Sequence, residues 1–240
     1  MTSRGPWPSG RRVAVILPSV NAVLEPDLAW VSPPDLSFHF SRVPLMATTP
    51  DGLREMNRSL EGTAALLSHL SPDLLVYACT SGSFVDGEEG LQTQLAMLSA
   101  VAGCPVVATS RAIIDAFRQI GARRIALATP YRHEVNLAEK AFFESHGLTV
   151  SAMVGMGLSG SAIREVPPQR ILELAREADT PDSDALFISC TDFRALEVLD
   201  DLERELSKPV LSSNQVTLWA IMRELGLPTS FPALGRLLAQ

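Results

Sequence analysis

The chain is poor in cysteine and lacks any arrangement of cysteine or histidine that is typical of a metal site. Of its 240 residues only three are cysteines, Cys79, Cys104 and Cys190, which are far apart and odd in number. No Cys-x-x-Cys pair occurs, and the four histidines include no i,i+4 pair and no His-Glu-x-x-His motif. These absences exclude a disulfide framework and give no reason to expect a metal.

Clustered positive charge and long apolar runs are also missing. The formal net charge is -7 and no Lys/Arg cluster occurs, which argues against a nucleic-acid partner or an anionic membrane surface. There is no run of about 18 apolar residues, and the first residues lack the apolar core of a signal peptide. We therefore expect a cytoplasmic protein with no membrane partner, and a disordered leader over residues 1–10.

Two stretches share an apolar run that ends in Cys-Thr. Residues 74–84 read LLVYACTSGSF, and residues 185–191 read ALFISCT. Such runs are typical of buried strands, and in open α/β sheets ligands bind beyond the carboxyl ends of the strands. The pattern predicts one site with two thiols, Cys79 and Cys190, whereas Cys104, at the start of another strand, is expected to be structural.

The two halves of the chain repeat one another. Three ordered matches join residues 11–18 to 123–130, Asp73 and Cys79-Thr80 to Asp184 and Cys190-Thr191, and 105–110 to 209–214. They indicate an internal duplication. Strands alternate with helices in both halves, which predicts an α/β fold of two pseudo-two-fold related lobes with mostly parallel sheets. We expect one lobe from residues 1–112, joined by 214–240, the other from 113–213, and the active site in the cleft between them.

Hydrophobic spacing predicts further elements. We expect strands at 13–17, 38–43 and 105–108, and helices after Asn21 and over 50–70, 91–101 and 110–120. Residues 155–160 read GMGLSG, which matches the dinucleotide-binding fingerprint in letters. Two prolines follow closely and no suitable acidic residue lies in a second strand, so we interpret this segment as a loop over the cleft.

Two polar residues near strand ends each have two readings. Tyr131 either lends its hydroxyl to a substrate carboxylate or is an amphipathic residue at the rim of the cleft. Asn21 either contacts a ligand or caps the following helix. The residues alone leave both alternatives open.

Several motifs spread over almost the whole chain resemble the aspartate/glutamate racemase superfamily. They are closest to its maleate cis-trans isomerase and arylmalonate decarboxylase branch, near the ectoine-utilisation (EutA-like) group. The residues that carry the resemblance are Pro18-Ser19-Val20-Asn21, Ala78-Cys79-Thr80-Ser81-Gly82, Ala128-Thr129-Pro130-Tyr131, Ser189-Cys190-Thr191 and Val210-Leu211-Ser212-Ser213-Asn214-Gln215.

The resemblance implies roles for these residues and chemistry without a metal or organic cofactor. It implies that Cys79 attacks an alkene and that Cys190 handles the proton. It also implies a set of substrate-binding residues, namely Asn21, Ser19, Thr80, Ser81, Tyr131, Thr191 and Ser161. Arylmalonate decarboxylases have glycine at the position of Cys79, so this cysteine favours an isomerase or racemase. Gly160-Ser161 stands where maleate isomerases carry Asp-Asn, so the resemblance implies that a donor to the substrate carboxylate is missing there. The EutA-like segment Ser212-Ser213-Asn214-Gln215 points to a small carboxylate other than maleate.

Three functions follow as alternatives. The first is a cofactor-independent two-cysteine isomerase or racemase of a small carboxylate or dicarboxylate, in which N–H groups at a helix start are expected to lower the pKa of Cys79. The second is an arylmalonate-type decarboxylase that uses Cys190 as proton donor. The third is a non-catalytic carboxylate-binding protein. For each of them we expect a homodimer or a dimer of dimers.

Overall fold

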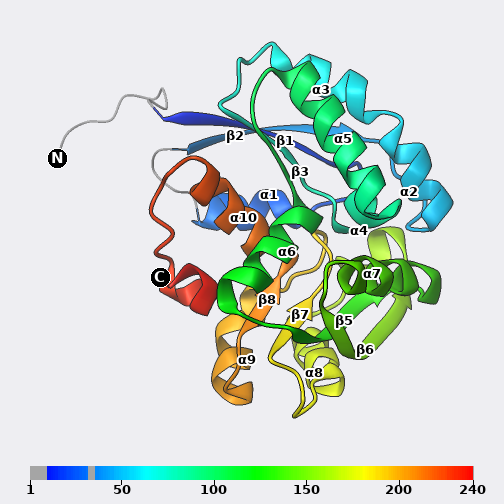
Figure 1. Cartoon of the computed structure of the whole chain (residues 1–240), viewed down its shortest axis with the longest axis vertical. Helices are drawn as coiled ribbons and strands as arrows, with labels where there is room; N and C mark the ends of the chain where they lie inside the picture. The colour runs from blue at the N-terminus through cyan, green and yellow to red at the C-terminus, as the bar shows by residue number, and fades with distance from the viewer. Residues whose placement is uncertain (1–9, 32–35, 240) are drawn as a thin grey trace.

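Two sheets of four parallel strands form the frame of the protein (Figure 1). The computed structural model describes residues 10–31 and 36–239, so the predicted leader lies outside the described residues except for Gly10. The first sheet has the strand order β2-β1-β3-β4 and the second has β6-β5-β7-β8. The strands are β1 Arg11–Pro18, β2 Leu36–Val43, β3 Leu74–Tyr77, β4 Val106–Ala108, β5 Arg124–Tyr131, β6 Thr149–Leu158, β7 Ala185–Ile188 and β8 Val210–Ser212. The predicted α/β fold of two related lobes is confirmed.

The duplication is visible in equivalent contacts as well as in the strand order. In the first lobe the Asp73 carboxylate accepts the backbone N–H of Arg12, the second residue of β1, at 2.8 Å. In the second lobe the Asp184 carboxylate accepts the backbone N–H of Arg124, the first residue of β5, at 2.7 Å. The same side chain thus ties the same pair of strands together in both lobes.

Helices cover the sheets and fill the space between the lobes. In Figure 1 the first sheet lies in the upper part of the molecule and the second in the lower part, with α6 and α10 between them. The helices are α1 Leu24–Val31, α2 Pro50–Asn57, α3 Leu60–Ser68, α4 Thr80–Phe84, α5 Gly87–Ala102, α6 Thr109–Ile120, α7 His133–Ser145, α8 Pro168–Ala178, α9 Leu199–Leu206 and α10 Ser213–Glu224. Short 3-10 turns are η1 Gly160–Ala162, η2 Leu196–Val198, η3 Pro232–Leu234 and η4 Arg236–Leu238.

The central strands are buried because helices cover both of their faces. Residues 13–17 of β1, 74–77 of β3 and 185–188 of β7 have no measurable exposure to solvent. Continuous apolar runs of this kind are typical of parallel sheets covered on both sides. The buried strands therefore hold the loops at their carboxyl ends in fixed positions, and it is in these loops that both predicted cysteines lie.

Two expectations about local structure were wrong. The helix predicted over 50–70 is divided into α2 and α3, because the N–H groups of Arg58 and Ser59 bond the carbonyls three residues back, which tightens the chain and ends α2. Most of the segment predicted as a loop over the cleft, residues 155–158, continues β6 instead. A Cβ on Gly155 would lie 2.1 Å from Nδ2 of Asn136 in α7, so glycine is needed there for close packing.

Candidate active site

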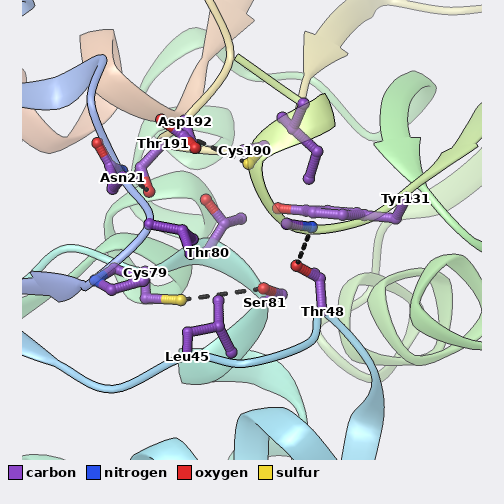
Figure 2. A pocket seen from close by; sticks show the side chains of 14 residues that line it. Asn21, Leu45, Thr48, Cys79, Thr80, Ser81, Tyr131, Cys190, Thr191 and Asp192 are labelled. Carbon is purple, nitrogen blue, oxygen red and sulfur yellow. Dashed lines mark hydrogen bonds between the residues drawn. The ribbon is translucent and has the colours of Figure 1, made fainter. Parts of the chain in front are cut away.

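A small, partly enclosed cavity lies where the carboxyl ends of β1, β3, β5 and β7 meet (Figure 2). Its volume is about 20 Å³, enough for about one water molecule. The residues that line it are Pro18, Val20, Asn21, Leu45, Thr48, Cys79, Thr80, Ser81, Tyr131, Gly160, Ile163, Cys190, Thr191 and Asp192. Both lobes contribute to the lining, and because the cavity has room for about one water molecule it must widen to admit a larger substrate.

The first cysteine ends β3 and caps α4. Cys79 is extended, and its sulfur accepts the N–H of Gly82 at 3.3 Å, as an N-cap side chain does. Burial nevertheless raises the pKa of Cys79 to about 11, against the opposing effects of the Gly82 N–H and of hydrogen bonds from Ser81 and Tyr77. The expectation that N–H groups lower this pKa below its ordinary value was therefore wrong, because desolvation in the small cavity outweighs them.

The second cysteine follows β7 in a strained backbone conformation. Cys190 has φ +96°, a region that residues with a Cβ rarely adopt. Its N–H donates to Oγ of Ser213 at 2.9 Å, and its sulfur accepts the N–H of Asp192 at 3.4 Å. Burial and the neighbouring Asp192 carboxylate raise the pKa of Cys190, whereas its hydrogen bond with Tyr131 lowers it. Cys190 is therefore held as a thiol more firmly than Cys79.

The two sulfurs come from different lobes and face the same cavity. In Figure 2 the Cys79 and Cys190 side chains approach from opposite sides, with Thr80 and Tyr131 beside them. A reacting group between them would meet one thiol on each face. This arrangement suits chemistry in which one thiol adds or removes a group and the other handles a proton.

Hydrogen bonds between the lobes hold the cavity walls together. They also occupy some of the side-chain hydrogen-bond donors, which are then not free to bind a ligand. Asn21 Nδ2 donates to Oγ1 of Thr191 at 3.1 Å, and the Thr191 hydroxyl donates to the carbonyl of Ala78 at 3.3 Å. The Thr80 hydroxyl donates to Oγ of Ser213 at 2.8 Å. The protons of both threonine hydroxyls are thus already engaged.

Asn21 fits both of its predicted roles, contact with a ligand and capping of the following helix. It lines the cavity, and its Oδ1 also accepts the N–H groups of Val23 and Leu24 at the start of α1. Because its Nδ2 carries a second proton, an N–H remains for a ligand. Asn21, Ser81 and Tyr131 are therefore the side chains best placed to donate to a carboxylate, and the capping bonds fix the first of them.

Tyr131 is buried at the end of β5, with 1% of its surface exposed. Its carbonyl accepts Nδ2 of Asn136 at 3.2 Å, and the Thr129 hydroxyl donates to the other end of that amide at 2.5 Å. This clamp holds the strand end where the tyrosine ring reaches the cavity (Figure 2). A rim position, the alternative reading for Tyr131, does not fit such burial.

A clasp between the lobes closes one side of the cavity. The N–H of Thr48, in the loop before α2, donates to Oγ of Ser159 at 2.9 Å, and the N–H of Gly160 donates to Oγ1 of Thr48 at 3.2 Å. Ser19 and Ser161, both predicted to bind substrate, lie outside the lining. The Ser19 hydroxyl accepts the N–H of Leu45 at 3.0 Å, and Ser161 is exposed next to Gly160.

The sequence patterns missed two buried carboxyl groups beside the cysteines. Asp192 lines the cavity, accepts the N–H of Ala22 at 2.7 Å, and has its pKa raised by burial to about 6. Glu139 of α7 accepts the Ser189 hydroxyl at 2.6 Å, and burial raises its pKa to about 8. Asp192 follows Cys190-Thr191 directly and could have been noticed there. Glu139 carries no sequence signal, because only the packing of α7 brings it to Ser189.

Neither a metal cluster nor a membrane-spanning helix is found in the part of the chain that the structure describes. Among residues 10–31 and 36–239, no three His, Cys, Asp or Glu side chains are grouped as metal ligands would be. No helix within those same ranges has the length and apolar character needed to cross a membrane.

The fold and cavity define an α/β enzyme whose two thiols face one site between duplicated lobes, and comparison with known proteins identifies its family. The family model described as arylmalonate decarboxylase matches residues 13–238. A maleate isomerase from Nocardia farcinica is 31% identical over 243 residues, covering 96% of each chain. The chain belongs to this family, in the branch that contains maleate isomerases and arylmalonate decarboxylases, as the sequence motifs predicted.

Solved structures of relatives agree. A maleate isomerase from Pseudomonas putida with maleate superposes with a TM-score of 0.91 at 26% identity, covering 96% of this chain and 98% of that one. A mutant maleate cis-trans isomerase from Nocardia farcinica with a covalently bound succinylcysteine intermediate gives 0.88 at 29% identity, with the same coverage. These relatives confirm the predicted fold and the predicted class, an isomerase that uses cysteine.

Proposed function

We propose that this protein catalyses the cis-trans isomerisation of a small unsaturated dicarboxylate, with Cys79 as nucleophile and Cys190 as proton donor and acceptor. One observation carries the proposal: two buried thiols from different lobes face each other across one small cavity. The pKa of Cys79 is raised less than that of Cys190. Cys79 is therefore the thiol that ionises first.

The reaction conserves atoms and charge within the thiol pair. The Cys79 thiolate adds to one alkene carbon while Cys190 donates its proton to the other, leaving a saturated adduct on Cys79 and a thiolate on Cys190. The former double bond is now single and rotates. Cys190 then removes a proton from that carbon and Cys79 leaves as a thiolate, which regenerates the double bond in the opposite geometry, the Cys79 thiolate and the Cys190 thiol.

The negative charge that develops on the substrate carboxylate during addition needs hydrogen-bond donors. Of the predicted binding residues, Asn21, Ser81 and Tyr131 offer donors from the cavity wall, whereas Thr80 and Thr191 hold the two lobes together. Ser19 and Ser161 do not line the cavity, and their contact with substrate stays a prediction. Maleate is the first substrate to test, because two relatives that cover 96% and 95% of the chain are maleate isomerases.

Decarboxylation is the second candidate, supported by the description of the matching family model. In that reaction Cys190 alone would protonate the intermediate, and Cys79 would not be needed. Racemisation would use both thiols but move only an α-proton. We further propose that residues 1–112 with 214–240 and residues 113–213 form the two lobes. A homodimer or dimer of dimers, and a cytoplasmic location, remain predictions.

Proton NMR in D₂O distinguishes the three reactions in one experiment. Incubation with maleate, small amino acids and aryl malonates should give the trans isomer, α-deuteration or loss of a carboxyl group, respectively. We expect isomerisation of a dicarboxylate, abolished by Cys79→Ser and strongly reduced by Cys190→Ser. Cys104→Ser is the matched control, because this third cysteine does not line the cavity. Full turnover of the active substrate by Cys79→Ser would contradict the role of Cys79 as nucleophile, and loss of a carboxyl group in that variant would favour decarboxylation.

A further inference from the structure

The chain contains only two tyrosines, and each is buried beside one of the two cavity thiols. The hydroxyl of Tyr131 acts to lower the pKa of Cys190, and the hydroxyl of Tyr77 acts to lower the pKa of Cys79. Tyr131 lines the cavity, but Tyr77 does not, and no measurable part of it is exposed. Tyr77 therefore reaches Cys79 from the protein interior and cannot touch a substrate.

Gly82 provides the space for this approach. A Cβ on Gly82 would lie 2.1 Å from Oη of Tyr77 and 3.0 Å from Sγ of Cys79. The hydroxyl and the sulfur thus converge on the same face of Gly82, which any side chain would occupy. The N–H of Gly82 also donates to that same sulfur, at 3.3 Å.

Asn57, the last residue of α2, holds the hydroxyl in position. The Tyr77 hydroxyl donates to Oδ1 of Asn57 at 2.5 Å, and Nδ2 of Asn57 donates to the carbonyl of Gly82 at 2.9 Å. A tyrosine hydroxyl has one proton and two lone pairs. With its proton on Asn57 it can accept from a Cys79 thiol, and by rotating it can donate to a Cys79 thiolate.

We propose that Tyr77 is a positioning residue for the nucleophile: its hydroxyl, admitted by Gly82 and held by Asn57, stabilises the thiolate of Cys79 from the side away from the substrate. The inference rests on the proposed role of Cys79 in isomerisation. It adds a residue that the binding set does not contain, and it gives a role to the buried Tyr77 hydroxyl and its bond to the partly buried Asn57.

Other titratable groups near this pair bear on any dependence on pH. Cys190 and Asp192 follow β7, Tyr131 ends β5, and Asp86 at the start of α5 lies on the Tyr77 side. Asp192 and Asp86 disfavour negative charge on Cys79 and Tyr77, respectively. Since these groups stay in place when Tyr77 is changed, a shift on removing the hydroxyl reports the hydroxyl itself.

The test measures the thiolate directly and does not depend on turnover. In a full-length background carrying Cys104→Ser and Cys190→Ser, only Cys79 contributes to the ultraviolet absorbance of thiolate as pH is raised. Tyr77→Phe should move the midpoint upward by about one pH unit, a tenfold loss of thiolate at a given pH. Asn57→Leu should move it downward, because the hydroxyl proton then has only the sulfur to bond.

The matched control is Thr63→Val in α3. It removes a different hydrogen bond in the same lobe, the one from the Thr63 hydroxyl to the carbonyl of Ser59. It should leave the midpoint unchanged even where stability falls. An unmoved or lowered midpoint in Tyr77→Phe would overturn the inference. So would an upward shift in Asn57→Leu, since that pattern reports a disturbed Gly82 loop. The proposed isomerase activity is judged separately, by Cys79→Ser turnover, so failure of one claim does not decide the other.

Discussion

The hydroxyl of Ser213 accepts the backbone N–H of Cys190 at 2.9 Å. The same oxygen accepts the hydroxyl of Thr80, the residue after the first cysteine, at 2.8 Å. Ser213 is the first residue of α10, whose start is fixed by a capping box between Ser212 and Gln215. One buried hydroxyl therefore joins the segments that carry both thiols and sets their relative position.

Replacing this hydroxyl should damage activity more than stability. In Ser213→Ala the buried N–H of Cys190 loses its acceptor, at a cost of about 1–3 kcal/mol in unfolding free energy. Because Cys190 is free to move, we expect kcat to fall at least tenfold with a smaller change in KM. Urea denaturation and steady-state kinetics measure the two effects.

Ser110→Ala is the matched control for Ser213→Ala. Ser110 is also fully buried, but its hydroxyl has no hydrogen-bond partner among the described residues. Its removal should leave kcat unchanged and cost little or no stability. Equal losses of kcat in both variants would show that the bond to Cys190 is not the cause.

The strained backbone of Cys190 predicts unequal effects of the same substitution at the two cysteines. Cys190 has φ +96°, whereas Cys79 has φ -142°. Glycine adopts a positive φ without strain, whereas the strain of a residue with a Cβ in that region costs about 1–3 kcal/mol. Cys190→Gly should therefore be less destabilising than Cys79→Gly by about 1–2 kcal/mol. Denaturant titration of both variants measures the difference, and equal costs would mean that Cys190 is not strained.

The clasp between Thr48 and Gly160 should control how tightly substrate is held. Thr48→Val removes the acceptor for the Gly160 N–H but keeps the volume of the side chain. We expect a KM about fivefold higher with a smaller change in kcat, consistent with one hydrogen bond of ~1 kcal/mol. Thr49→Val is the control, because Thr49 caps α2 without reaching the second lobe. A KM increase limited to Thr49→Val would contradict the role of the clasp.

Buried Glu139 should make stability depend on pH. Its pKa is raised from 4.5 to about 8 in the folded protein, so its contribution to stability is fully present below pH 4.5 and declines as pH rises toward 8. Glu139→Gln removes this titration. The unfolding free energy of the variant minus that of the parent should rise with pH over this interval, by at most about 1.4 kcal/mol per pH unit.

Ser189→Ala serves as the comparison for Glu139→Gln. It removes the hydrogen bond to Glu139 but keeps the carboxyl group, so the decline in stability with pH should persist. Urea titrations at a series of pH values measure both variants. A difference that stays constant with pH for Glu139→Gln would mean that the carboxyl group is ionised throughout.

The sequence predicted those features that repeat or follow a strand. The matched Cys-Thr pairs located both cavity thiols, and the repeated aspartates marked equivalent strand pairs that the structure bears out. The break between α2 and α3 was missed because Arg58 and Ser59 do not interrupt the hydrophobic period. The raised pKa of Cys79 was also missed, since it depends on how completely the small cavity excludes water.

Side chains that act behind the cavity left no pattern. Tyr77 belongs to an apolar run that reads as an ordinary buried strand, and Asn57 ends a helix 20 residues earlier. Only the folded chain brings both against Gly82. Ser213 was recognised as part of a motif, but its contact with Cys190 depends on how α10 packs between the lobes.

The central claim is that Cys79 forms a covalent bond with the substrate while Cys190 handles the proton. The most direct measurement is intact-protein mass spectrometry with peptide mapping, after incubating the Cys190→Ser variant with maleate and quenching in acid. We predict a mass increase of one substrate molecule, located on Cys79 and absent from Cys104 and from the Cys79→Ser variant. An unmodified Cys79 in a Cys190→Ser variant that still turns maleate over, or an adduct located on another residue, would contradict it.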